Sequence, residues 1–143
     1  MKKPIISLIA AVSFGVALLA TTLAAPFSTV RIRAEIPFDF MVGKKRLPKG
    51  EYLIESLNDS GTLTIRHAKK GKAATFNTIR HKPTDSNKSK LVFNRYGDKY
   101  FLSQVARGHG NGVMQLPTSK LEKEVQIAAN QGVPAKKVVV AVK

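Results

Sequence analysis

The sequence contains no cysteine and no tryptophan, and only nine acidic residues stand against 24 basic ones. The absence of cysteine excludes disulfides, metal sites built on thiolates and lipidation at an N-terminal cysteine. The shortage of acidic residues gives a formal net charge of +15. Such an excess predicts attraction to anionic partners such as lipid head groups, acidic polysaccharides or phosphate-bearing surfaces, although a solubilising role alone also accounts for it.

The first 24 residues have the composition of a cleavable secretory signal. Lys2 and Lys3 precede an uncharged run from Ile5 to Ala20, and Thr22-Leu23-Ala24 places small residues before a signal-peptidase site. A run of this length also suffices for a membrane anchor, since about 20 apolar residues span a bilayer. The small residues at its end and the following Pro26 favour cleavage after residue 24. Because no twin arginine is present, we expect export by the general secretory route to the periplasm or the cell exterior.

Residues 25–143 are the expected mature chain, a single β-rich domain of 119 residues. The leader holds two basic and no acidic residues, so the mature chain keeps a net charge of +13. A domain of this size buries enough apolar surface to fold without disulfides.

Apolar and polar residues alternate from Val30 to Val42. Every even-numbered residue of this stretch is apolar, which is typical of a strand with one buried face. Pro37 cannot donate to a ladder, so we expect the strand to bend there and to serve two sheets around a corner. The basic segment Gly43–Gly50 is expected to follow as a turn.

Further strands are predicted at roughly regular spacing, with turn residues between them. Gly97-Asp98 separates two aromatic-rich segments and predicts a tight hairpin. A polar loop is expected at residues 81–89 and a glycine-rich loop at residues 107–112. The expected strands after the first are residues 51–57, 62–67, 73–80, 90–96, 99–105 and about 137–142.

One helix is expected near the carboxyl end. Ser119 and Glu122 have capping-box spacing, and Gly132 suits a C-terminal cap. Apolar residues recur between them at helical spacing, at Leu121, Val125 and Ala128. We therefore predict a mainly β fold, a small antiparallel sandwich or partly open barrel of about seven strands, with one C-terminal amphipathic helix at about 119–131.

Three segments together resemble one family: IPFDFMVGKKRLPKGEY, NDSGTLTIR and LVFNRYGDKYFLSQ. They are similar to small secreted bacterial proteins with an I-P-F-x-F-x-V-G…L-P-x-G-x-Y opening and an F-x-R-Y-G-D-x-Y-F-L hairpin. The resemblance covers most of the mature chain, from about Val30 to the helix. It implies a compact extracytoplasmic β domain, and it carries over no activity and no site residues.

The carboxylates and histidines do not form a recognisable catalytic or metal site. Glu35 and Asp39 share one strand face, but four residues of strand separate them by about 13 Å. Glycosidase pairs lie about 5–9.5 Å apart, so each carboxylate is expected to balance an arginine instead. His67, His81 and His109 lie in three segments without metal-ligand spacing, although their meeting around zinc in the fold stays geometrically open.

Two further motifs fail as catalytic signals. Gly108–Gly112 lacks the spacing and the βαβ context of a dinucleotide fingerprint, and Ser103 lacks a nucleophile-elbow context. We therefore expect no enzymatic activity, no cofactor and no metal.

The basic turns are the strongest candidates for a binding site. If the strands run up and down, alternate loops share one end of the molecule, where their charges suit an anionic polymer or membrane surface. Tyr96 and Tyr100 could stack on bases or sugars, but no RNA-binding motif is present and the expected compartment argues against nucleic acid. The predicted binding residues are Lys44, Lys45, Arg46, Lys49, Lys69, Lys70, Lys72 and Lys99.

Three functions remain open from the sequence. The leading hypothesis is an exported, non-enzymatic β domain that binds or scaffolds through its basic surface. The second is a small barrel that carries an apolar ligand, which needs about eight strands to leave room inside. The third is a hydrolase of cell-wall or matrix polymers, which only the expected compartment favours.

Overall fold

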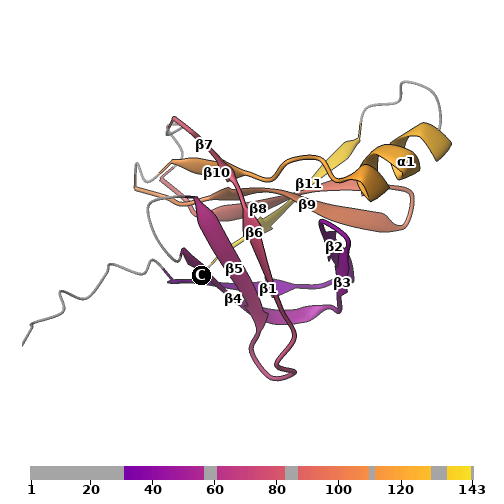
Figure 1. The fold of residues 1–143 in the computed structure, drawn as a ribbon. Coiled ribbons are helices and arrows are strands. Elements are labelled where there is room, and N and C mark those ends of the chain that lie inside the picture. Colours follow the sequence, from indigo (N-terminus) through magenta and orange to yellow (C-terminus); the bar gives the residue numbers. More distant parts are fainter. Residues whose placement is uncertain (1–30, 57–60, 83–86, 110–111, 130–134, 143) are drawn as a thin grey trace, which may run out of the picture.

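The structure, a computed structural model, describes residues 31–56, 61–82, 87–109, 112–129 and 135–142. Within these ranges the chain forms eleven strands in two sheets and one helix (Figure 1). The two sheets fit a sandwich and do not close into a barrel, which confirms the predicted mainly β fold. The predicted signal and its cleavage site lie outside the described residues.

The two sheets differ in the number and the pairing of their strands. The first is antiparallel and contains, in spatial order, β1 (Arg31–Ile36), β4 (Gly50–Ser56), β5 (Thr62–His67) and β6 (Ala73–Asn77). The second contains, in spatial order, β11 (Lys136–Ala141), β8 (Lys90–Tyr96), β9 (Lys99–Ala106), β10 (Val113–Gln115) and β7 (Ile79–His81). In this sheet β9 also pairs with β2 (Phe40–Val42), which forms a hairpin with β3 (Lys45–Leu47).

The predicted corner at Pro37 is present. The chain before it, β1, pairs with β4 in the first sheet, and the chain after it, β2, pairs in the second sheet. The even-numbered side chains face the interior: Ile36 and Phe40 are buried, and Phe38 is half-buried. One alternating stretch therefore contributes to the core from both sheets.

The chain returns to the first sheet between β3 and β4, over Pro48 and Lys49, and crosses to the second sheet again at Thr78. The predicted strand over residues 73–80 is divided there into β6 and β7. The Thr78 amide and hydroxyl both donate to the Gly61 carbonyl oxygen, at 2.9 and 2.6 Å. The ladder between β5 and β6 ends just before this contact, at Thr62 and Asn77, and Ile79 begins the pairing with β10.

Two strands of three residues were not predicted from the sequence. The expected basic turn Gly43–Gly50 contains β3, and the chain after the expected glycine-rich loop forms β10. Each has one fully buried residue, Leu47 in β3 and Met114 in β10, which is too short a pattern to reveal a period of two. These two strands and the two divided ones raise the number from about seven to eleven.

Side chains fill the space between the sheets. Phe40 lies at the centre, and its ring centroid is 5.1 Å from that of Tyr52 and 5.4 Å from that of Phe93. Other fully buried side chains are Ile36, Leu47, Ile54, Leu63, Ile65, Leu91, Phe101, Val105 and Met114. The hypothesis of an apolar ligand inside a hollow barrel therefore finds no support in the described part of the chain.

The helix α1 (Lys120–Ala128) lies beside the end of the second sheet where β8 turns into β9 (Figure 1). The predicted N-cap is present, because Ser119 Oγ accepts a 3.1 Å hydrogen bond from the Glu122 amide. The Glu122 carboxylate turns into the sheet, where Oε1 accepts hydrogen bonds from Asn94 Nδ2 at 2.7 Å and Tyr96 OH at 3.3 Å. Glu122 therefore docks the helix on β8 as well as occupying the third helical position.

The carboxyl-terminal elements differ slightly from their predicted bounds. The helix ends at Ala128 instead of at about residue 131, and the expected cap Gly132 lies outside the described residues. The last strand, β11, pairs antiparallel with β8 along its length and leaves Val139 exposed. Within the described ranges, no helix has the length and apolar character needed to cross a bilayer.

Candidate anion-binding surface

The first basic turn is the hairpin between β2 and β3. Val42 pairs with Lys45, which leaves a two-residue turn of Gly43 and Lys44. Gly43 has a φ of 60°, a conformation that glycine adopts without strain. Lys44, Lys45 and Arg46 therefore stand exposed around a tight reversal of the chain.

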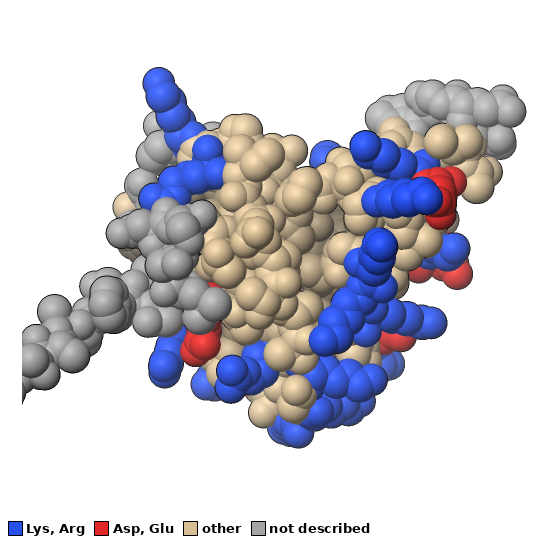
Figure 2. All heavy atoms as spheres, in the orientation of Figure 1, with Lys and Arg blue, Asp and Glu red and all other residues tan. Residues whose placement is uncertain are grey.

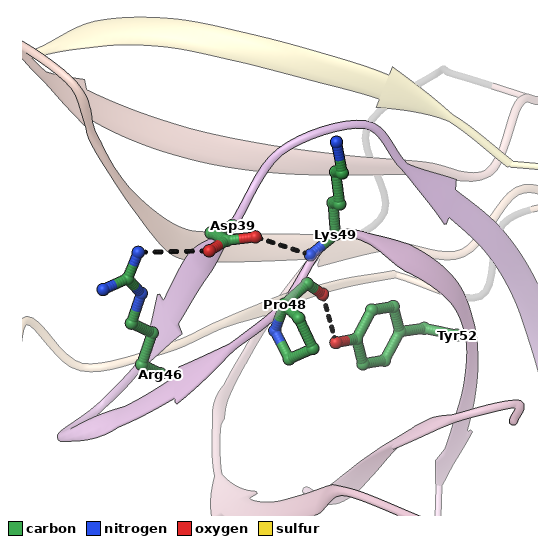
Figure 3. Close-up of polar contacts among 5 residues, drawn as sticks. All are labelled: Asp39, Arg46, Pro48, Lys49 and Tyr52. Atoms are coloured by element: carbon green, nitrogen blue, oxygen red, sulfur yellow. Dashed lines mark hydrogen bonds and ion pairs between the residues drawn. The ribbon is translucent and has the colours of Figure 1, made fainter. Parts of the chain in front are cut away.

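Asp39 ties this hairpin to the start of the next strand (Figure 3). Its Oδ2 lies 3.1 Å from Arg46 Nη2, and its Oδ1 accepts a 2.9 Å hydrogen bond from the Lys49 amide. The hydrogen bond from the Lys49 amide is the main reason why the pKa of Asp39 is lowered. Partial desolvation raises this pKa, and Arg46 lowers it further. In Figure 3 the Lys49 side chain extends away from the Asp39 carboxylate and from Tyr52.

Tyr52 holds the same segment from the protein interior. Its hydroxyl donates a 2.5 Å hydrogen bond to the carbonyl oxygen of Pro48 (Figure 3). Burial raises the pKa of Tyr52 to about 12, and the negative charge of Asp39 adds to the effect. The backbone of Pro48 and Lys49 is thus fixed on two sides, by Tyr52 at a carbonyl and by Asp39 at an amide.

His67 organises the second basic turn, which connects β5 and β6. Its Nδ1 accepts hydrogen bonds from the amides of Lys69 and Lys70, at 3.1 and 3.2 Å. Its own amide donates to the Lys72 carbonyl oxygen at 2.7 Å. The ring is 5% exposed and contacts the Tyr52 ring at a centroid distance of 4.9 Å. The lysines therefore project from a turn whose backbone is held by a buried side chain.

A hydrogen bond joins the two basic turns. Lys45 Nζ donates to the carbonyl oxygen of Ala73 at 2.5 Å, one residue after Lys72. Figure 2 shows lysine and arginine side chains gathered over the lower and right-hand parts of the molecule, where Figure 1 places the β5–β6 turn and the β2–β3 hairpin. The fold thus brings together two predicted turns through residues that lie 28 positions apart in the sequence.

A groove of about 530 Å³ lies between the start of β4 and the β5–β6 turn, and we call it the lysine groove. Three predicted residues line it: Lys49, Lys69 and Lys70. Its other lining residues, which the sequence did not assign to the site, are Arg33, Glu35, Gly50, Glu51, His67 and Ala141. The placement of His67 after the inward-facing residues of its strand indicated burial, but nothing in the sequence linked it to Gly50.

A second groove of about 250 Å³ lies between the β2–β3 hairpin and α1, and we call it the helix groove. Two more predicted residues, Arg46 and Lys99, line it together with the acidic Asp39 and Asp98. Its remaining lining residues are Phe40, Met41, Tyr100, Phe101, Leu121 and Val125. The two acidic residues therefore balance the two basic residues of this groove, and most of its remaining lining is apolar.

The fold thus distributes the predicted binding residues between the two grooves and the exposed turns. Lys44 and Lys72 line neither groove and stand exposed on their turns, and Lys45 bridges the turns. The carboxylates of the surface are paired mainly with arginines and not with lysines. The arginine pairs are Arg31–Glu55 at 3.0 Å, Arg33–Glu51 at 3.3 Å and Arg46–Asp39 at 3.1 Å.

The three lysines of the lysine groove have no such partner. Among the described residues, no ion pair within 4 Å includes the ammonium group of Lys49, Lys69 or Lys70. Their charge is consequently available to an external anion, and the fixed backbone beneath them lowers the entropy lost when they bind one.

The other candidate residues are dispersed. Glu35 and Asp39 line different grooves, and Asp39 balances Arg46 as predicted. In the part of the chain that the structure describes, no three histidine, aspartate or glutamate side chains gather so that they could hold a metal ion.

The two tyrosines proposed as stacking platforms are engaged by the protein itself. Tyr96 is buried, and its hydroxyl contacts Glu122. Tyr100 stacks on Phe38 at a centroid distance of 3.9 Å, and the Arg95 guanidinium lies 5.4 Å from its ring centre. Stacking of these rings on bases or sugars therefore gains no support from the geometry.

Comparison with known proteins does not indicate a function for this surface. No family model matches the chain, and neither a curated protein nor a solved structure does. The resemblance to small secreted bacterial proteins therefore stays a prediction.

Proposed function

We propose that the protein is an exported, non-enzymatic β domain that binds anionic polymers through its two joined basic turns. The observation that carries the proposal is the convergence of Lys49, Lys69 and Lys70 on one groove, with no acidic partner within 4 Å among the described residues. Lys45 ties the turns together, so their charges act on a ligand as one surface.

Backbone rigidity supports binding more than the charge alone does. Asp39 and Tyr52 hold the segment that bears Lys49, and His67 holds the turn that bears Lys69 and Lys70. A polymer with regularly spaced negative groups meets these cations at fixed positions, and only the side-chain rotamers must be ordered on binding. Exposed lysines that merely confer solubility need no such support.

The test compares two variants that lose the same charge. Binding to dextran sulfate and to polygalacturonate is measured by titration at several salt concentrations, because counterion release makes the affinity of a multi-lysine contact fall steeply with salt. The site variant replaces four lysines of the turns with glutamine, at Lys44, Lys49, Lys69 and Lys72. The control variant makes the same change at four distant positions, Lys82, Lys120, Lys123 and Lys136.

We expect the site variant to bind at least tenfold more weakly at low salt and to show a shallower dependence of affinity on salt. The control variant should remain within about threefold of the unaltered protein, because net charge alone acts weakly at a distance in screened solution. Equal losses in the two variants would show that only net charge matters and would refute a specific site.

A further inference from the structure

In the buried imidazole of His67, Nδ1 is hydrogen-bonded to the protein backbone and Nε2 faces the lysine groove. Its Nδ1 accepts from two amides and so carries no proton, which places the ring proton on Nε2. The side chain is 5% exposed, yet it lines the groove. No residue in the described ranges accepts a hydrogen bond from Nε2, and Nε2 is not among their fully buried polar atoms without a partner, so this N–H donor can be reached from the groove.

Gly50 leaves this nitrogen accessible. A Cβ atom at this position would lie 2.6 Å from His67 Nε2, so any side chain would occupy the space in front of it. Gly50 also has a φ of 147°, in a region that other residues rarely adopt. Since both residues line the same groove, the missing side chain opens a path from the groove to the Nε2–H donor.

The charges around this donor favour a doubly charged anion. Lys49, Lys69, Lys70 and Arg33 bring four positive charges to the groove, and two carboxylates, one of them paired with Arg33, bring two negative charges. The groove therefore has an excess of two positive charges. A phosphate monoester carries about −1.5 to −2 at neutral pH and matches this excess, whereas a carboxylate, a sulfate ester or a phosphodiester carries one charge.

We infer that the lysine groove binds a phosphate monoester group, with one phosphate oxygen accepting the hydrogen bond from His67 Nε2 and the three lysine ammonium groups around the others. The inference rests on the proposed function and names the anionic group that its site selects. The volume of about 530 Å³ exceeds that of a phosphate and leaves room for the sugar-sized body that carries it.

The test uses small probes, so that it does not depend on polymer avidity. Glucose 1-phosphate is titrated into the full-length purified protein, with glucuronate and dimethyl phosphate as singly charged comparisons. We expect glucose 1-phosphate to bind at least tenfold more tightly than either comparison. In nitrogen-resolved NMR spectra of the imidazole, its addition should shift the Nε2–H resonance of His67 on the unaltered protein, without any need for a variant.

The decisive variant is His67→Asn. The asparagine Oδ1 takes the position of Nδ1 and keeps an acceptor for the amides of the turn, while no atom replaces the Nε2–H donor. We expect it to lose about tenfold in affinity for glucose 1-phosphate, as loss of a hydrogen bond to a charged group implies, and to bind dextran sulfate as before. Lys123→Gln, on the distant helix, should leave both affinities unchanged.

The outcomes separate this inference from the proposed function. If the polymers bind through the turns but glucose 1-phosphate binds no better than dimethyl phosphate, or His67 is unaffected, the phosphate site is refuted and the proposed function stands. If glucose 1-phosphate binds at His67 but no polymer binds, the polymer function fails and the site for a phosphate monoester is retained. Equal binding of glucose 1-phosphate by the His67→Asn variant and the unaltered protein also overturns the assignment.

Discussion

The hydroxyl of Tyr52, on a strand of the first sheet, reaches back to the carbonyl oxygen of Pro48, four residues earlier, at 2.5 Å. The phenol is fully buried between the sheets, where its ring contacts Phe40 and His67. The core residue at this position therefore also positions Lys49, the cation that follows Pro48 in the chain. Stability and the shape of the lysine groove are coupled through this one side chain.

Replacement of Tyr52 by phenylalanine tests this coupling. The ring stays in place while the Pro48 carbonyl loses its partner, so we expect the free energy of unfolding to fall by about 1 kcal/mol. Urea denaturation measures the change. Tyr100→Phe is the matched control, since the Tyr100 ring is half-buried and lies in the other groove, and it should change stability by less than half as much. Equal effects would show that the Pro48 bond adds nothing.

The same side chain predicts a loss of stability in alkali. The pKa of Tyr52 is raised from 10 to about 12, so its stabilising contribution is complete below pH 10 and is lost as the pH rises towards 12. A difference of this size corresponds to about 2–3 kcal/mol. We expect Tyr52→Phe to flatten the decline, measured as the urea midpoint against pH. A smaller decline should remain, because burial and the neighbouring Glu122 also raise the pKa of Tyr96.

In acid the relevant carboxylate is Asp39. Its pKa is lowered by the Lys49 amide and by Arg46, so the stability that it contributes is present above the pKa of the unfolded chain and disappears as the pH falls through the folded value. Asp39→Asn should therefore lower stability at neutral pH and lose less of it between pH 5 and pH 2. Parallel acid curves for the variant and the unaltered protein would contradict this role.

Gly50 and Gly71 form a matched pair for testing how closely the backbone of Gly50 approaches the His67 ring. Both have positive φ, 147° and 62°, so alanine is strained at either position. Only at Gly50 would the new Cβ collide, at 2.6 Å from His67 Nε2, whereas nothing lies within 4 Å at Gly71. We expect Gly71→Ala to cost about 1 kcal/mol and Gly50→Ala at least twice that, by thermal unfolding. Similar costs would show that His67 moves aside freely.

Much of the fold could be predicted because its strongest patterns are local. The alternation around Pro37 gave both the buried face and the corner, and Gly97-Asp98 gave the hairpin of β8 and β9. The short strand β3 could not be found, because its only buried residue, Leu47, is surrounded by lysine and arginine. Its strand conformation comes from pairing with β2, which is a tertiary effect and leaves no periodic pattern.

The site could be predicted only in part for a related reason. Clustered lysines mark exposed turns in any sequence, so the turns themselves were apparent. The groove depends on the register of β4 and β5, which pairs Tyr52 with His67 and brings the turn after His67 next to Gly50. A sequence gives the residues of each strand but not which of them lie opposite each other, so His67 and Gly50 were not assigned to the site.

The three crossings of the chain, after Pro37, over Pro48 and Lys49, and at Thr78, give the sandwich a property that neither sheet has alone. Each sheet shares a continuous peptide with the other at all three places, and Phe40, directly after the first crossing, packs on Tyr52 of the opposite layer. Separating the layers would pull β1 from β2, β3 from β4 and β6 from β7. The described domain should therefore melt in a single cooperative transition, and neither half of it should survive as an independently folded fragment.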